Sequence, residues 1–133
     1  IEEASSLVIA KINEMQPDVI ICGGMAEKNQ KLTIESQASF QANTLKTTVD
    51  LENLLTGLTD TAISNDAGKF VCEGLYYSVL QELQTQQLAS KSLNKNNSRC
   101  VFVHVPILTP DNLSVIVDDF RLILQKLALL YKA

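Results

Sequence analysis

A cysteine and a histidine in this chain have the residue types and positions of a nucleophile–base pair. The segment Ser64–Cys72, with sequence S-N-D-A-G-K-F-V-C, follows a short apolar run and leads into a long helical pattern. A helix N-terminus presents unpaired N–H groups and the positive end of the helix dipole, a setting that lowers the pKa of a thiol. His104 is the single histidine of the sequence. Cys72 and His104 are therefore candidates for thiolate chemistry assisted by a general base.

The composition limits the classes of protein to which this chain can belong. The chain has 133 residues, of which 46% are hydrophobic and 20% charged, which predicts one globular domain over residues 1–133 with its own core. The net charge is −4 and no basic stripe with interleaved aromatic residues is present, so we expect no nucleic-acid partner. Apolar runs stay far below the roughly 18 residues that span a bilayer, and no segment resembles a signal peptide, so we expect no membrane association.

The cysteines predict a reducing environment. Cys22, Cys72 and Cys100 include no C-x-x-C spacing, which argues against a zinc site. An odd number of cysteines, two of them in apolar runs, indicates free thiols and a cytoplasmic location. We expect Cys22 and Cys100 to be core residues. The sequence starts at Ile1 inside a helical pattern, and we expect further N-terminal residues to precede it.

Hydrophobic periodicity predicts an alternation of helices and strands. The expected helices cover residues 1–16, 48–58, 70–89 and the segment that begins at Pro110. The expected strands cover residues 18–22, 31–43, 59–64 and 99–105, and residues 90–98 are expected to form a polar surface loop. This order predicts an α/β fold in which helices cover a mostly parallel sheet.

The predicted sheet suggests how the two reactive side chains meet. Cys72 follows the carboxyl end of the predicted strand 59–64, and His104 lies at the carboxyl end of the predicted strand 99–105. Sites in parallel sheets lie at the carboxyl ends of strands, so we expect the two residues to converge. His104 shares one face of its strand with Phe102, and the valines at 101, 103 and 105 take the other face.

Four segments resemble the pyroglutamyl peptidase I family, also called pyrrolidone carboxyl peptidase. Ser64–Cys72 resembles that family's nucleophile segment S-N-T-A-G-T-F-V-C, and Phe102–Pro106 (F-V-H-V-P) resembles F-I-H-I-P, which supplies the catalytic histidine. Asp18–Ala26 is similar to a buried strand that ends in a glycine-rich turn, and Thr33–Phe40 is similar to the segment around the catalytic glutamate. The resemblance runs in the same order from the first helix to the last.

The resemblance implies a three-layer α/β/α sandwich and a cysteine peptidase that removes N-terminal pyroglutamate without a metal or cofactor. Carried over residue by residue, Cys72 is the nucleophile, His104 the general base and Glu35 the acid that orients the histidine. The implied partner is a peptide with a blocked N-terminus. Members of the family assemble as dimers or tetramers, so the resemblance also implies a homo-oligomer.

The sequence departs from the family at positions that concern the substrate. The N-terminal strand and phenylalanine-bearing loop that cover the pyroglutamyl ring have no counterpart here, nor does the arginine segment after the glutamate. Ser36 stands at the usual arginine and Glu73 at the usual asparagine. Two alternatives therefore stay open: a cysteine hydrolase of the same fold with another amide substrate, and a non-catalytic binding relative in which Glu35 is merely a solvated strand residue.

Overall fold

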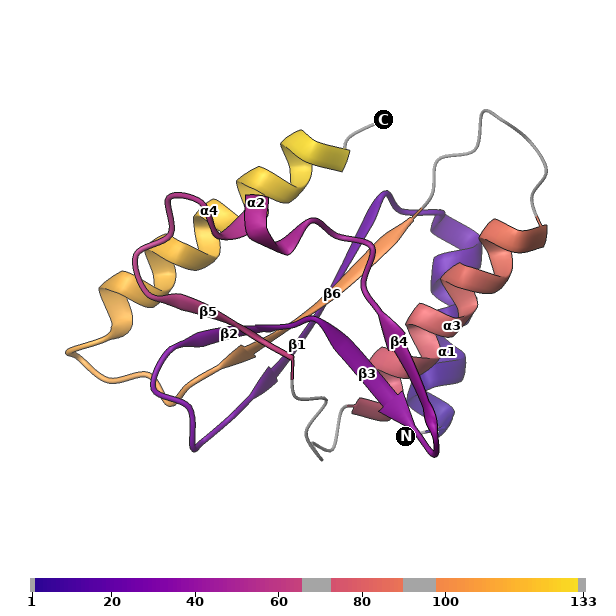
Figure 1. The fold of residues 1–133 in the computed structure, drawn as a ribbon, viewed down its shortest axis with the longest axis horizontal. Helices are drawn as coiled ribbons and strands as arrows, with labels where there is room; N and C mark the ends of the chain where they lie inside the picture. The colour runs from indigo at the N-terminus through magenta and orange to yellow at the C-terminus, as the bar shows by residue number, and fades with distance from the viewer. Residues whose placement is uncertain (1, 66–72, 90–97, 132–133) are drawn as a thin grey trace.

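The computed structural model describes residues 2–65, 73–89 and 98–131, and its helices and strands alternate along the chain (Figure 1). In chain order they are α1 (Glu2–Met15), β1 (Val19–Met25), β2 (Leu32–Glu35), β3 (Gln37–Phe40), β4 (Asn43–Lys46), α2 (Leu51–Leu55), β5 (Thr61–Ser64), α3 (Glu73–Ala89), β6 (Arg99–Val105) and α4 (Leu113–Tyr131).

The fold is built around a central sheet. Its strands lie in the order β1-β6-β2-β5, and β3 and β4 form a separate hairpin. The pairs β1–β6 and β2–β5 are parallel, and the middle pair β2–β6 is antiparallel. Helices α2 and α4 cover one face and α1 and α3 the other, which makes three layers (Figure 1). The predicted α/β/α sandwich with a mostly parallel sheet is confirmed.

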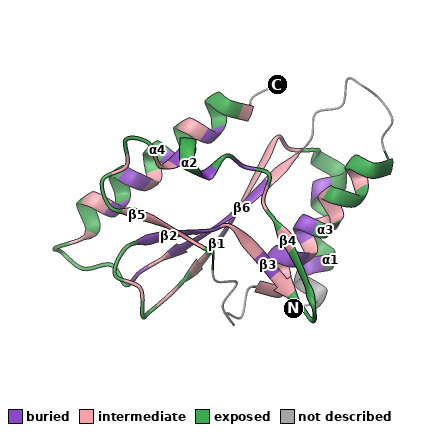
Figure 2. Ribbon diagram, in the orientation of Figure 1, coloured by how far each residue is buried: buried purple, intermediate pink, exposed green. Residues whose placement is uncertain are grey.

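Strand β6 divides the core in two by the alternation of its side chains. Val101 and Val103 are fully buried on the face covered by α2 and α4, where they pack with Ile123 and Leu127 of α4. Cys100 and Phe102 point to the other face, against α1 and α3. Figure 2 shows the resulting pattern, with purple strands between helices whose outer sides are green. The predicted alternation along residues 101–105 is therefore confirmed.

The predicted single strand 31–43 is wrong. It breaks at Ser36, whose N–H donates to the Ser64 carbonyl while its own carbonyl accepts from Thr47, so the chain leaves β2 and turns into the β3–β4 hairpin. The break also places side chains before and after Ser36 in different parts of the core. Ala38 packs in the core beside α1 and α3, whereas Ile34 lies in the core beside α2 and α4.

Other element boundaries differ by a few residues. β1 continues through Gly23 and Gly24 to Met25, because β6 runs beside it over its whole length. α2 is shorter than predicted and begins after Asp50, whose side chain caps it by accepting from the Asn53 N–H. The first residues of the predicted helix 70–89 and most of the predicted loop 90–98 lie outside the described residues.

Asp119 of α4 holds the segment that leads into β5 through hydrogen bonds. Its carboxylate is almost fully buried and accepts hydrogen bonds from the N–H groups of Thr59 (2.9 Å) and Asp60 (2.8 Å) and from the Thr61 hydroxyl (2.7 Å). Burial raises the pKa of Asp119, but these hydrogen bonds together lower it below its usual range. The carboxylate therefore stabilises the junction between α4 and the sheet.

Asp119→Asn is expected to lower the free energy of unfolding at neutral pH by about 2–4 kcal/mol, because an amide places a donor against groups that donate. The unfolded aspartate titrates near a pKa of about 3.9. Since the folded pKa is lower, the contribution is present above that value and lost as the pH falls through the folded pKa. Urea unfolding across the acid range measures the difference. The exposed neighbour Asp118→Asn is the control, and equal effects of both variants at neutral pH would refute this role.

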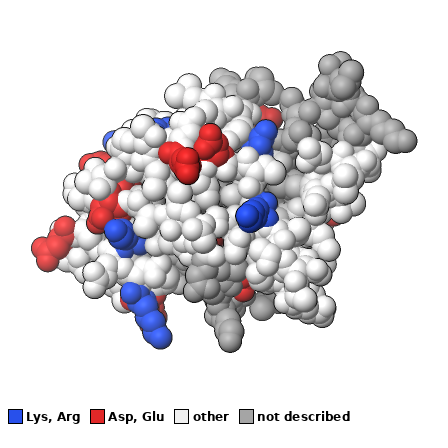
Figure 3. Space-filling view, in the orientation of Figure 1, with Lys and Arg blue, Asp and Glu red and all other residues white. Residues whose placement is uncertain are grey.

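The described helices include none that is both long and apolar enough to cross a membrane. On the face shown in Figure 3, the described Lys and Arg side chains lie among Asp and Glu side chains.

Candidate active site

A buried carboxylate–imidazole pair lies on the sheet. The Nδ1 atom of His104 is 3.1 Å from the Oε1 atom of Glu35, and both side chains are less than a tenth exposed. Glu35 ends β2 and His104 lies near the end of β6, and the antiparallel register sets Glu35 opposite Phe102 and Thr33 opposite His104. Glu35 and His104 are thus diagonal neighbours, close enough for long side chains to meet.

The pairing fixes the chemistry of the imidazole. An ionised carboxylate only accepts hydrogen bonds, so the network assigns the proton to Nδ1 of His104, which donates to Glu35. In the neutral ring, Nε2 then carries the lone pair. A histidine held in this tautomer by a buried acid is the arrangement that general bases of nucleophilic hydrolases use.

Aromatic side chains hold the pair in place. The hydroxyl of Tyr76, in α3, donates to the backbone carbonyl of Glu35 at 2.8 Å, and burial raises the pKa of Tyr76 so that it stays a donor. The Phe102 ring stacks at a tilt between Tyr76 (centroids 5.6 Å apart) and His104 (4.7 Å apart). Contacts with the buried rings of Tyr76 and Phe102 therefore restrict the movement of Glu35 and His104.

One oxygen of Glu35 has no hydrogen-bond partner among the described residues. Oε2 is inaccessible to solvent, whereas Oε1 pairs with His104. An unsatisfied buried polar atom costs about 1–3 kcal/mol, and such costs concentrate at functional sites. The stability of the fold alone therefore does not explain why a glutamate is buried at this position.

Cys72 lies outside the described residues, so the structure gives no position for its sulfur. The described residues on either side of the 66–72 segment are tied to β3. The Asn65 carbonyl accepts from the Gln37 side chain at 2.9 Å, and the Glu73 carboxylate accepts from the Ser39 N–H at 3.0 Å. Both flanks of this segment are thus held by the strand that follows Glu35.

The geometric reason predicted for convergence at this site is wrong. β2 is parallel to β5 but antiparallel to β6, so β5 and β6 run in opposite directions and their carboxyl ends do not share an edge. In the observed register, Glu35 of β2 is paired with Ser64, the last residue of β5. On its other side Glu35 is paired with Phe102 of β6, two positions before His104. β2 thus links the end of β5 to the pair.

Glu35 is also more buried than a glutamate on the solvent-facing side of a strand would be. Only 4% of its surface is accessible, which excludes the alternative that Glu35 is a solvated strand residue. The prediction that Cys22 and Cys100 are core residues is confirmed, since both are buried. The bond from Tyr76 to Glu35 was missed because no local spacing connects residues 41 positions apart.

Tyr76→Phe is expected to remove the hydroxyl that holds the Glu35 backbone while keeping the ring. We expect a loss of about 1 kcal/mol in the free energy of unfolding, because one buried hydrogen bond is lost. Tyr77→Phe, which leaves the bond to Glu35 intact, is the matched control. Equal stability of the two variants in urea unfolding would show that the Tyr76 hydroxyl does not hold the Glu35 backbone.

The donor set of the site is that of acid–base chemistry. Among the described residues, no three His, Cys, Asp or Glu side chains lie close enough together to hold a metal ion. The pair consists of one imidazole and one carboxylate, which can orient and transfer a proton.

The site is thus a buried acid–histidine pair on a three-layer α/β/α sandwich. No protein-family model matches the chain. Nor does any curated protein match it.

Several solved structures of pyroglutamyl peptidases share this fold. A mutant pyrrolidone carboxyl peptidase from the hyperthermophile Pyrococcus furiosus has a TM-score of 0.74 and 17% sequence identity, with 95% of this chain and 76% of that chain covered. Pyroglutamyl peptidase I from Bacillus amyloliquefaciens has a TM-score of 0.73 and 19% identity, with 93% and 72% covered. At these identities the similarity establishes a shared fold.

Proposed function

We propose that this protein is a cysteine peptidase that removes N-terminal pyroglutamate from peptides, with Cys72 as nucleophile, His104 as general base and Glu35 as the orienting acid. The observation that carries the proposal is the 3.1 Å contact between buried Glu35 and His104. It is supported by the fold shared with pyroglutamyl peptidases and by the nucleophile-like segment that ends at Cys72.

The proposed reaction proceeds through a thioester. Nε2 of His104 takes the proton of the Cys72 thiol, the sulfur attacks the pyroglutamyl carbonyl, and the tetrahedral oxyanion is stabilised by N–H groups at the start of the helix that follows. His104 then gives its proton to the leaving amine, the C–N bond breaks and a thioester forms. Water attacks this thioester with His104 again as base, and pyroglutamate leaves. Glu35 stabilises the imidazolium throughout.

The setting proposed for this activity follows from the same residues. The substrate is a peptide with a blocked N-terminus. Free thiols suit a reducing compartment, so we place the protein in the cytoplasm. A homo-oligomer remains the assembly expected from the family resemblance.

A fluorogenic pyroglutamyl amide tests the proposal. We expect the full-length protein to release the fluorophore and Cys72→Ala to lose at least about 10³-fold in kcat/KM, because the nucleophile is removed. Cys22→Ala removes a buried thiol outside the proposed triad and is the matched control. Absence of turnover by wild-type protein, or equal turnover by Cys72→Ala, would overturn the assignment.

A cysteine hydrolase of the same fold with another amide substrate is the second candidate. It is favoured by the absence of the arginine segment after Glu35, where the structure has the β3–β4 hairpin instead. A broad cysteine-directed probe that labels Cys72 in protein inactive on pyroglutamyl substrates would support this reading. A Cys72 no more reactive than an ordinary thiol would favour the non-catalytic relative.

A further inference from the structure

Two buried thiols lie side by side in the core beside α1 and α3. The sulfur of Cys22, in β1, is 3.8 Å from the sulfur of Cys100, in β6, and both cysteines are free. The strands are parallel neighbours, and the register sets Cys100 opposite Ile20, two positions before Cys22. Both side chains belong to the core beside α1 and α3, so the pair is surrounded mainly by apolar groups.

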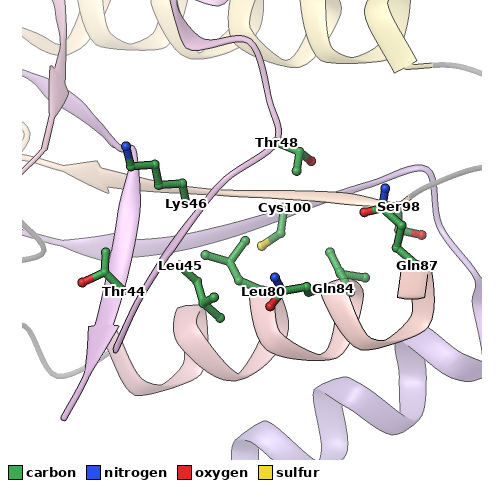
Figure 4. A pocket seen from close by; sticks show the side chains of 10 residues that line it. Thr44, Leu45, Lys46, Thr48, Leu80, Gln84, Gln87, Ser98 and Cys100 are labelled. Atoms are coloured by element: carbon green, nitrogen blue, oxygen red, sulfur yellow. The ribbon is translucent and has the colours of Figure 1, made fainter. Parts of the chain in front are cut away.

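A pocket leads to this pair. It has a volume of about 280 Å³ and is lined by residues of β4, α3 and the start of β6. In Figure 4 the Cys100 sulfur points from β6 into the space between β4 and α3, beside Leu45 and Leu80. Threonine, glutamine and serine side chains, together with the cation Lys46, line the same pocket. The pocket therefore ends at the fully buried Cys100, and the Cys22 sulfur lies next to that of Cys100.

We propose that Cys22 and Cys100 form a two-coordinate site for a soft monovalent cation of the Cu(I) class. Thiolates are the side chains that select such ions, and two of them suffice for the low coordination number that Cu(I) accepts. If the bonds are as long as zinc–thiolate bonds, about 2.3 Å, a linear ion places the two sulfurs roughly 4.6 Å apart, so the sulfurs, now 3.8 Å apart, have to separate by less than about 1 Å.

The geometry favours a bridging ion over a direct sulfur–sulfur bond. The register offsets the two cysteines by two positions on neighbouring parallel strands, which puts their Cα atoms roughly 8 Å apart, whereas a disulfide needs Cα atoms within about 7 Å. Binding is a proton exchange without a redox step: each thiol loses its proton, two S–Cu bonds form, and the site carries one negative charge.

The test uses the full chain with Cys72→Ala, which leaves Cys22 and Cys100 as its thiols. Cu(I) is supplied anaerobically as a complex with a coloured chelator, and its transfer is followed by the loss of that colour. We expect one Cu(I) per chain, and a loss of roughly a hundredfold or more in affinity when either Cys22→Ala or Cys100→Ala is added, because one of two bonds is removed. Activity plays no part in this readout, so the result is independent of the proposed function.

X-ray absorption on the Cys72→Ala protein provides the second measurement, which depends on no further substitution in the core. Two sulfur neighbours and no others at about 2.3 Å would support the site. Three or more ligands, no Cu(I) transfer to the folded protein, or equal affinity after loss of one of the two cysteines would overturn it.

Discussion

His104→Gln is expected to lower kcat/KM on a pyroglutamyl amide by about 10³-fold or more. The substitution removes the group proposed to take the proton of Cys72 and to protonate the leaving amine, and general acid–base catalysis of both steps contributes on this scale. The glutamine amide can still donate to the Glu35 carboxylate, which keeps the buried acid partnered. The loss should therefore appear in activity rather than in folding.

Thermal unfolding provides the control for His104→Gln. We expect a melting temperature within a few degrees of wild type, since the buried donor to Glu35 is retained. A variant that is folded and keeps more than a tenth of wild-type kcat/KM would rule out His104 as the general base.

Glu35→Gln is expected to lower kcat by about 10²–10⁴-fold with a much smaller change in KM. The amide can donate to Nδ1 of His104 as readily as it can accept, so it no longer enforces the tautomer in which Nε2 carries the lone pair. It also withdraws the charge that stabilises the imidazolium formed when the thiol loses its proton. The measurement is steady-state kinetics at saturating and limiting substrate.

Glu27→Gln is the matched control for Glu35→Gln, because Glu27 is an exposed glutamate outside the sheet. It should leave both kinetic constants within about twofold of wild type, as exposed substitutions usually do. If Glu35→Gln behaved in the same way, the buried pair would be a packing feature and not part of a catalytic site.

The layered fold could be predicted because its signals are local. The valines of β6 alternate with Phe102 and His104, and this pattern alone assigns the two faces of the strand. Helices α1, α3 and α4 carry apolar stripes that give their type, and their ends differ from prediction by only a few residues where both are described.

The pairing of strands could not be predicted from the sequence. The apolar alternation keeps the same phase before and after Ser36, so a single polar residue at that position does not show that the chain leaves the sheet there. The antiparallel contact of β2 with β6 depends on segments about 70 positions apart (69 between Glu35 and His104). That contact is what buries Glu35 and brings it to His104, so the resemblance could name the pair but not its geometry.

The most direct test of the proposed triad is the alkylation rate of Cys72 by iodoacetamide at about pH 6, followed by mass spectrometry of the cysteine peptides. At this pH an ordinary thiol is almost wholly protonated, whereas a cysteine paired with an imidazole is a thiolate. The triad predicts that Cys72 in wild-type protein reacts at least about tenfold faster than Cys72 in His104→Gln, while buried Cys22 and Cys100 react slowly in both. Equal rates for Cys72 in the two proteins would show that the buried Glu35–His104 pair does not act on this thiol, and would contradict the assignment.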